Sequence, residues 1–449
     1  SFQGGLAQEA PATPTPRPTR PAGAGSTPGQ TWTVMLYQDA DDKVLEQDIY
    51  VDLNEAELVG STDRVNIVAQ VDRYRGGYRG DGDWTDTRRY YITRDNDLQR
   101  VSSQLVESLG EVNMANRDTL VDFAAWAIEN YPADKYVLIM SDHGMGWPGG
   151  WSDPATGGGA PSISRTPLGD ALGNHMYLDQ IDAALDEIRA RTGVDQLEIV
   201  GMDACLMGHI EVLSALEPHA RYAVVSQETE PALGWAYTSF LGELTQNPDM
   251  DGAQLGQIIV DSYIQQDQRI LNDQARAEWV GRSPMSARQL TSQLERNITL
   301  TAADLSALPA LIDRVNELAF RLQEVDQRDV AKARNYTQSF TSVFGSDVPP
   351  SYIDLGNFAG LLKQASRSQA VNQAADGVLA ALDNLIVAEK NGSNKPGANG
   401  LSIYFPNSQL FKLAAAGLRS YVPVSQRFAG QSLWDDFLAF HYTGRSFDA

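Results

Sequence analysis

The single cysteine of this 449-residue chain and one of its five histidines stand in similar local patterns. The strand-like run YVLIMS leads into Asp142, His143 and Gly144, and the run LEIVGM leads into Asp203, Ala204 and Cys205. In an open parallel sheet, ligands bind beyond the carboxyl ends of the strands. Because one expected helix, 178–191, connects the two runs, they can be neighbouring strands. The pattern therefore predicts that Cys205 and His143 meet at one edge of a sheet.

A thiol beside an imidazole suits nucleophilic attack on a carbonyl carbon. A free thiol has a pKa near 8.5 and is only a few per cent ionised at neutral pH, so His143 would take its proton and later protonate the leaving amine. The dipole of an expected helix at 206–216 would favour the Cys205 thiolate. The N–H groups of Gly144 and Cys205 would form an oxyanion hole, worth about 3 kcal/mol per donor.

Each of these residues also has a structural interpretation. A lone cysteine is usually a small buried hydrophobic residue, and a lone histidine is at least as often structural as catalytic. His209, four residues after Cys205, is the local competitor as a base. The functional interpretation is favoured because both residues follow strands and both are flanked by Asp and Gly.

Composition and motifs exclude several other classes of protein. The chain has 58 Asp and Glu against 35 Lys and Arg, a formal net charge of −23, which argues against binding to nucleic-acid backbones or anionic lipid. One cysteine excludes an intramolecular disulfide and a CxxC motif. HExxH, GxSxG and GxxxxGK motifs are absent from the sequence, and no apolar run reaches the roughly 18 residues that span a bilayer.

Strand-like and helical patterns alternate from Trp32 onward. A parallel sheet covered on both faces is expected from this alternation, because the strands are almost continuously apolar. We expect strands at 32–38, 65–71, 88–93, 136–141, 197–202, 221–226 and 400–405, and helices at 46–59, 118–130, 178–191, 206–216, 252–266 and 302–325. The stretch 269–297 is polar and is expected to be a surface excursion, and the WDDFLAFHY segment is expected to dock on the body.

Residues 1–30 are rich in Pro, Thr, Gly and Ala, a composition typical of a disordered tether. The chain begins with Ser, which suggests that an upstream segment was removed, and a Pro/Thr-rich stalk favours export or display at the cell surface. We find no interdomain linker between residues 31 and 449 and expect one folded domain there, with 300–449 integral to it.

Several motifs resemble the clostripain family of cysteine peptidases, within the caspase-like fold group. They are SDHGMGW (141–147), MDACLMG (202–208), the opening stretch from WTVMLYQDADDK, VNIVAQVDR (65–73), SQETEPALGWAY (226–237) and GLSIYFP (400–406). The matches span about residues 31–445. The resemblance implies a caspase-like α/β/α sandwich, with His143 and Cys205 as the catalytic dyad.

The resemblance also implies substrate preference. Family members typically cleave after Arg or Lys with an acidic residue just before the nucleophile, and Asp203 holds that position; its alternative role is to cap the helix at 206–216. The stretch 226–237, including Ser226, would form a wall that pairs with the peptide as an added strand. Trp235 would contact a substrate side chain or plug the rim, and Glu228 and Glu230 would be further acidic partners or solvated charges.

Self-processing is a further implication. The segment between His143 and Cys205, about 147–177, shows no evident secondary structure, and Arg165 is its single basic residue. By resemblance to family zymogens we predict cleavage after Arg165, which would leave two associated fragments; an uncut surface loop is the alternative. Calcium is possible near Asp39-Ala40-Asp41-Asp42 or Asp81-Gly82-Asp83, but the sequence assigns no ligands.

Taken together, the sequence predicts an exported cysteine endopeptidase, made as a zymogen and acting on proteins or peptides with Arg or Lys at the cleaved bond. No cofactor is needed for this chemistry, no third catalytic residue is evident, and a monomer is expected. The alternative is a catalytically silent relative that serves as a binding or adhesion module. A glycoside hydrolase with paired carboxylates has no supporting motif.

Overall fold

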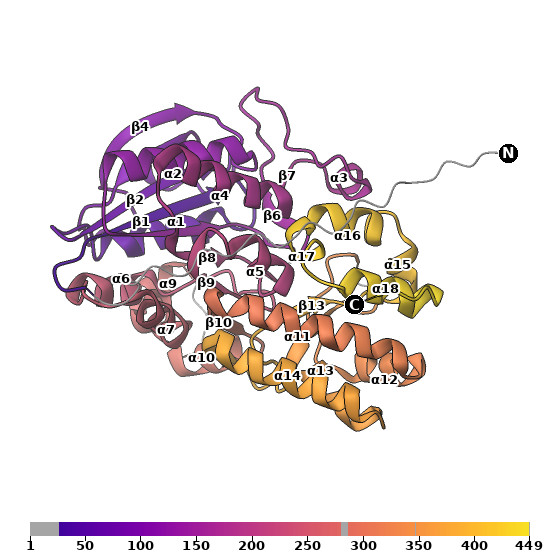
Figure 1. Cartoon of the computed structure of the whole chain (residues 1–449). Helices are drawn as coiled ribbons and strands as arrows, with labels where there is room; N and C mark the ends of the chain where they lie inside the picture. The colour runs from indigo at the N-terminus through magenta and orange to yellow at the C-terminus, as the bar shows by residue number, and fades with distance from the viewer. Residues whose placement is uncertain (1–26, 280–285, 346, 449) are drawn as a thin grey trace.

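The computed structural model describes residues 27–279, 286–345 and 347–448 (Figure 1). The expected tether at 1–30 lies almost entirely outside the described residues. None of the helices within the described ranges is long and apolar enough to cross a membrane.

A nine-stranded sheet forms the centre of the described chain, in the order β12-β10-β9-β8-β5-β1-β2-β3-β4. Its five central strands are parallel: β9 (Ala220–Val225), β8 (Leu197–Asp203), β5 (Lys135–Ser141), β1 (Trp32–Ala40) and β2 (Val65–Arg73). The outer strands are antiparallel: β3 (Thr87–Tyr91), β4 (Gln104–Gly110), β10 (Thr299–Asp304) and β12 (Ile386–Asn391). Every residue of β1, β5 and β8 is buried, as expected for parallel strands covered on both faces.

Two helical layers cover the sheet and make the expected α/β/α sandwich (Figure 1). Met35, Leu138 and Val200 pack beneath α2 (Arg117–Asn130), α4 (Leu178–Thr192) and α5 (Ile210–Leu216). The alternate residues Val34, Val137 and Ile199 face α1 (Glu46–Glu57), α6 (Tyr237–Gln246) and α7 (Gly252–Ser262). This alternation follows from the two-residue period of a strand.

The C-terminal third adds strands β10 and β12 to the main sheet and a group of helices that extends the first layer (Figure 1). These helices are α11 (Leu308–Arg321), α12 (Gln327–Tyr336), α13 (Leu355–Ala365), α14 (Gln369–Leu385), α15 (Ser408–Lys412), α16 (Leu418–Val424), α17 (Gln426–Ala429) and α18 (Trp434–Thr443). A two-stranded sheet joins β11 (Tyr352–Asp354) to β13 (Ser402–Tyr404). The terminal helix docks through Trp434, Phe437 and Leu438, which are buried.

The structure corrects five of the predicted segments. The segment 302–325 begins as strand β10, passes through a short turn of 3-10 helix and only then becomes α11, because Asp304 ends the strand and caps the turn at Ser306. The segment 147–177 contains β6 (Gly149–Ser152), α3 (Pro167–Leu172) and β7 (His175–Tyr177). The helix expected at 206–216 starts at Ile210, and the one expected at 252–266 ends at Ser262. The stretch 269–297 contains α8 (Gln268–Leu271), α9 (Asp273–Trp279) and α10 (Ala287–Leu294).

Candidate active site

The two loops that carry His143 and Cys205 are in contact. Strands β5 and β8 are parallel neighbours, and Ser141 lies opposite Asp203 in their register. Each loop residue therefore stands two positions beyond a paired residue at the same edge of the sheet. The Cα of Gly144 packs so closely on Cys205 that a Cβ there would overlap the Cys205 carbonyl oxygen. Glycine at 144 is thus a condition for the two loops to meet.

The imidazole of His143 is held in place by the carboxylate of Asp42. Its side chain is 44% exposed, and its Nε2 lies 3.2 Å from Oδ2 of Asp42. The other oxygen of Asp42 accepts the N–H groups of Val44 at 2.7 Å and Leu45 at 2.8 Å, which fixes the carboxylate. An Nε2–H donated to Asp42 leaves Nδ1 as the basic nitrogen. The hydrogen bond to Asp42 raises the pKa of His143, and burial opposes it.

The Gly144 N–H takes no part in the hydrogen bonds described for the turn after His143. Trp151 N donates to His143 O at 3.0 Å, and Met145 N donates to Gly149 O at 2.8 Å, on either side of the bridge between Gly144 and Gly150. Neither bond uses the Gly144 N–H. This group is therefore suited to the oxyanion role expected for it.

Cys205 lies in a tight turn, not at a helix N-terminus. The following residue, Leu206, has a φ of 65°, in the left-handed region that non-glycine residues rarely adopt. The Glu230 N–H donates to Sγ at 3.4 Å. Burial raises the pKa of the Cys205 thiol, and the charges of Glu228 and Asp203 raise it further. The predicted stabilisation of the thiolate by the dipole of a helix at 206–216 is therefore wrong, because that helix starts five residues later.

Asp203 lies buried at the end of β8, two residues before Cys205. Its Oδ2 accepts the hydroxyl of Tyr237 at 2.8 Å and the N–H of Trp235 at 3.3 Å. The cap position of α5 is His209, so the alternative role of Asp203 as a helix cap is excluded. Burial raises the pKa of Asp203, and its hydrogen bonds oppose the rise.

Glu230 forms hydrogen bonds with both Cys205 and Trp235. Its Oε2 accepts the indole N–H of Trp235 at 3.1 Å, and its main-chain N–H faces Cys205. Burial raises its pKa well above the usual range, and the charge of Asp203 and their mutual hydrogen bond add to the effect. Asp203 and Glu230 therefore form an acidic pair beside the thiol, in which the protonated form of Glu230 is favoured.

The other residues expected in the substrate wall are turned inward. Ser226 is buried, and its hydroxyl lies 2.8 Å from both Glu228 O and Thr299 O, to one of which it donates. Glu228 forms an ion pair with Lys395, which lowers its pKa against the effect of burial. The Trp235 ring has no exposed surface and packs under Gly201. These three side chains stabilise the segment 226–237 from within and are not exposed on its surface.

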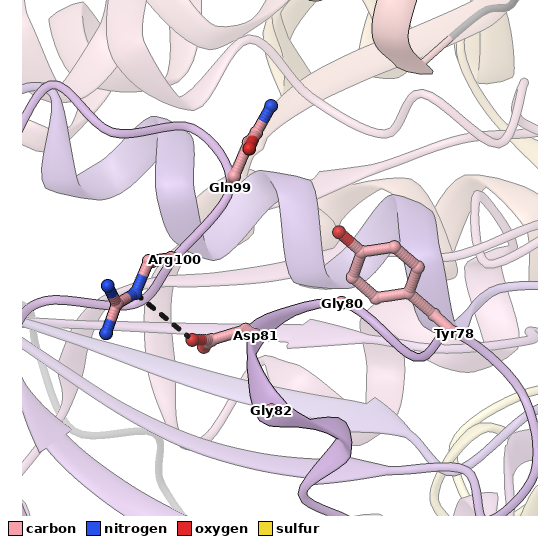
Figure 2. Close-up of a pocket in the computed structure, with 6 residues that line it drawn as sticks. All are labelled: Tyr78, Gly80, Asp81, Gly82, Gln99 and Arg100. Atoms are coloured by element: carbon pink, nitrogen blue, oxygen red, sulfur yellow. Dashed lines mark ion pairs between the residues drawn. The ribbon is translucent and has the colours of Figure 1, made fainter.

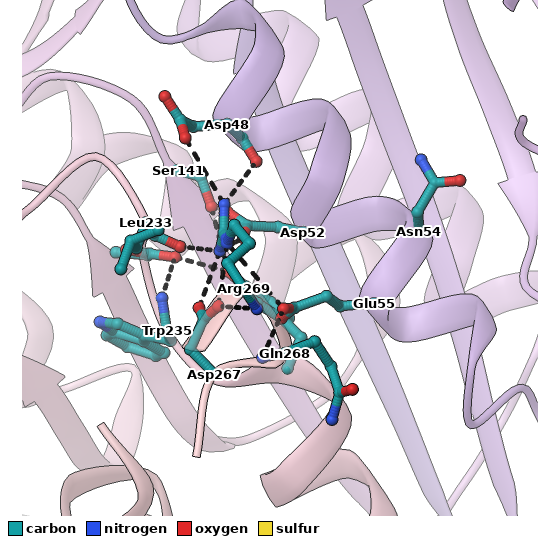
Figure 3. A network of polar contacts seen from close by, with 12 residues as sticks. Asp48, Asp52, Asn54, Glu55, Ser141, Leu233, Trp235, Asp267, Gln268 and Arg269 are labelled. Carbon is teal, nitrogen blue, oxygen red and sulfur yellow. Dashed lines mark hydrogen bonds and ion pairs between the residues drawn. The ribbon is translucent and has the colours of Figure 1, made fainter. Parts of the chain in front are cut away.

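Arg269 is fully buried and has several acidic side chains around it (Figure 3). Arg269 contacts Asp52 at 2.7 Å, Asp267 at 2.9 Å and Asp48 at 3.6 Å, and it donates to the carbonyl of Leu233. Leu233 precedes Gly234, whose Cα approaches the carboxylates of both Asp52 and Asp203. Arg269 thus joins α1 and Asp267 to the turn at Leu233 and Gly234, which leads to the Trp235 N–H that binds Asp203. The carboxylates around Arg269 outnumber this single cation.

Arg165 lies exposed, directly before the Thr166 cap of α3. On either side of it, β6 and β7 pair with one another, with Gly149 opposite Tyr177. The two sides of this segment are therefore joined by a sheet that does not depend on the peptide bond at 165. The prediction that the segment lacks secondary structure is wrong, because its ends are buried through Trp151 and Met176.

A surface depression of 470 Å³ lies on a different part of the sheet edge, after β2 (Figure 2). Its lining residues are Tyr78, Gly80, Asp81, Gly82, Gln99 and Arg100. None of them belongs to the loops around Cys205 and His143, so we do not assign this depression to the peptide site.

Sequence reasoning missed Asp42 and Arg269. The DADD stretch at the end of β1 was interpreted only as a possible metal cluster, although the carboxyl end of a strand beside β5 is a position from which a side chain reaches His143. His209, the competitor base, has no exposed surface and packs edge-on against Tyr352. It cannot reach a substrate.

The fold and site define a cysteine peptidase of the caspase-like class. Two solved structures share the fold: a secreted C11 cysteine protease from Bacteroides thetaiotaomicron in complex with an irreversible peptide inhibitor (TM-score 0.57, 18% identity, 88% of this chain and 99% of that one), and an inactive zymogen C11 protease from Parabacteroides distasonis (TM-score 0.59, 14% identity, 92% and 99%). Clostripain from Hathewaya histolytica is 30% identical over 214 residues, 42% of this chain and 36% of clostripain.

The sequence profile of the clostripain family matches residues 36–440. The chain therefore belongs to the clostripain family. The chain aligns with only about a third of the length of clostripain itself.

Proposed function

We propose that this chain is a secreted endopeptidase that cleaves after arginine or lysine with His143 and Cys205. The observation that carries the proposal is the contact of the Gly144 loop with Cys205, with the imidazole fixed from behind by Asp42. Export is supported by the solved relatives described as secreted. The zymogen described for the Parabacteroides protein supports synthesis as a precursor.

The geometry suits a general-base mechanism. The raised pKa of Cys205 keeps the thiol protonated in the free enzyme. Nδ1 of His143 would take that proton as Sγ attacks the carbonyl carbon, and the N–H groups of Gly144 and Cys205 would hold the oxyanion. The imidazolium would then protonate the leaving amine. Water, deprotonated by His143, would release the acyl group and restore the thiol.

The acidic pair explains a basic side chain before the cleaved bond. Asp203 is buried, Glu230 is half-buried, and both have a raised pKa, so a guanidinium or ammonium group entering beside them would supply the positive charge that the two carboxylates lack. Glu228 is already paired with Lys395 and would contribute little. We therefore assign the pocket to Asp203 and Glu230.

A panel of fluorogenic peptides that differ only before the cleaved bond tests this proposal. We expect kcat/KM for Arg and Lys to exceed that for Gln by about 100-fold or more, since a desolvated charge pair contributes about 2–5 kcal/mol. Asp203→Asn should remove most of that advantage and leave the slow cleavage after Gln unchanged. Equal rates for Arg and Gln would contradict the pocket. No cleavage of any peptide, with a folded chain, would favour a binding module instead.

Calcium remains a proposal for this chain and is not needed for the steps above. A family dependence on calcium would require hard oxygen ligands, and the described residues do supply a fitting carboxylate set. The set consists of Asp41, Asp72 and Asp153, which are all buried.

A further inference from the structure

The turn that carries Cys205 is fixed by the main chain of the neighbouring segment 226–230. The carbonyl of Glu228 accepts the N–H of Leu206 at 3.2 Å, directly after the nucleophile. The N–H of Glu230 donates to Sγ of Cys205 itself at 3.4 Å. The position of the thiol therefore depends on where this segment lies.

The side chain of Glu228 joins this segment to the C-terminal third of the chain. Its Oε2 forms the ion pair with Lys395 at 2.5 Å, and its Oε1 accepts the N–H of Thr341 at 3.2 Å. Lys395 lies in the connection between β12 and β13, with Nζ 5.6 Å from the centre of the Phe340 ring. The side chains of Glu228 and Lys395 are only 4% and 16% exposed, so salt and water screen their attraction little.

Glu228 also acts on the thiol through its charge. Burial raises the pKa of Cys205, the N–H of Glu230 lowers it, and the charge of Glu228 raises it again. The ionisable groups around the thiol are Asp203, Glu228, Glu230, Tyr263 and His143. Within the parts of the chain that the structure describes, Lys395 is the only lysine or arginine that contacts the Glu228 carboxylate. Without Lys395, an uncompensated negative charge would therefore face Sγ.

We propose that Lys395 is a positioning residue for the peptidase reaction and acts on Cys205 through Glu228. Its ammonium group fixes the Glu228 side chain, and with it the carbonyl that holds the Leu206 N–H. The same ammonium group offsets the charge of Glu228, so that the thiol ionises more readily when its proton is removed. The inference rests on the proposed role of Cys205 as the nucleophile.

Alkylation by iodoacetamide, followed by intact mass, reports on Cys205 alone because it is the only cysteine of the chain. The reaction needs no substrate, so it gives a result whether or not a peptide is cleaved. In Lys395→Met we expect the pH midpoint of alkylation to rise and the rate at about pH 8 to fall by about three- to tenfold, since a like charge disfavours the thiolate. The same variant should lower kcat by a similar factor and leave KM unchanged.

Two further variants separate the charge of Lys395 from its packing. Lys395→Arg keeps the cation and should restore the alkylation profile and kcat. Glu228→Gln added to Lys395→Met removes the uncompensated charge and should bring the alkylation midpoint back to the parental value or below it. Lys363→Met, which breaks a more exposed ion pair with Asp376, is the matched control and should behave like the parent.

The proposal is overturned if Lys395→Met reacts with the parental pH profile, or if the double variant keeps the full shift. If Lys395→Met does not fold, Glu228→Gln alone decides: it should lower the midpoint, and an unchanged midpoint would contradict an effect of this pair on the thiol. A parent that cleaves no peptide, with variants that shift the alkylation profile as expected, would count against the proposed function and still support the action of Lys395 on Cys205.

Discussion

At the scale of single residues, Asp42 raises the pKa of His143. The imidazole gains its proton more readily because Nε2–H is donated to that carboxylate, while the nearby charge of Asp142 acts in the same direction. The protonated form cannot accept the thiol proton. Activity should therefore fall as pH drops through the raised pKa of His143.

Asp42→Asn should move the acid limb of the kcat/KM profile to lower pH and reduce kcat by about 10- to 100-fold, part of the ~10²–10⁴-fold supplied by general acid–base catalysis. The asparagine oxygen can still accept the N–H groups of Val44 and Leu45, so the turn is kept. The check is a pH–rate profile on an arginyl peptide, with the exposed Asp326→Asn as control. An unmoved acid limb would show that Asp42 does not act on His143.

The residue-scale predictions differed in how well local patterns could support them. Cys205 and His143 were recognisable because each follows an apolar strand and is flanked by Asp and Gly. Trp235 and Ser226 were not predictable as inward-facing, because their burial depends on Gly201 and Thr299, which are distant in sequence. Asp42 depended on the lateral order of strands, which the sequence does not contain.

At the scale of elements, the close approach of two loops depends on Gly144. A methyl group there would overlap the carbonyl of Cys205, which is main chain and cannot rotate away. Gly144→Ala should therefore reduce kcat/KM by about 100-fold or more, since loss of one oxyanion donor alone has that effect. Gly360→Ala is the matched control, because its Cβ would meet open space in α13.

Both glycine variants are checked by peptide hydrolysis and by urea unfolding. Gly360→Ala should keep full activity. Its free energy of unfolding should rise by about 0.5–1 kcal/mol, as expected for Gly→Ala within a helix. Gly144→Ala with full activity would mean that the two loops do not meet as described.

The ion pairs of Arg269 are a second feature that belongs to the scale of elements. Arg269→Met leaves Asp52 and Asp267 buried without a cation, which should lower the free energy of unfolding by about 3–5 kcal/mol. Urea unfolding measures the change, with the exposed Arg328→Met as control. A loss below about 1 kcal/mol would show that these carboxyls are neutral in the folded chain.

Helix boundaries show where sequence patterns fail. Strands β1, β5 and β8 were predictable because they are uninterrupted apolar runs. The start of α5 was not, because Cys205–Gly208 has helix-compatible residues but is held in a turn by Leu206 and Gly208 N–H bonds to Glu228 and Ser226. The apparent helical dipole at Cys205 was a consequence of that error.

At the scale of the whole molecule, one sheet holds residues from both sides of the predicted cut. We expect the protein to cleave itself after Arg165, giving fragments of 165 and 284 residues from the 449. Because β5 pairs with β8 and β6 with β7, the fragments should elute together in gel filtration and separate only in denaturant.

Arg165→Ala should stay intact, and so should Cys205→Ala, while Arg288→Ala, outside the segment, should be cut like the parent. Denaturing gels over time, with mass spectrometry of the fragments, follow the cut. Cleavage of Cys205→Ala at the parental rate in the same preparation would show that another protease is responsible.

The central claim is that Cys205 attacks a carbonyl beside a pocket for a basic side chain. Its most direct test is the intact mass of the protein after reaction with a peptidyl arginyl chloromethyl ketone. We predict one adduct per chain, on Cys205, that forms far more slowly with the Gln analogue and does not form in Cys205→Ala. A folded wild-type chain that takes no adduct, or takes it equally with the Gln reagent, would contradict this account.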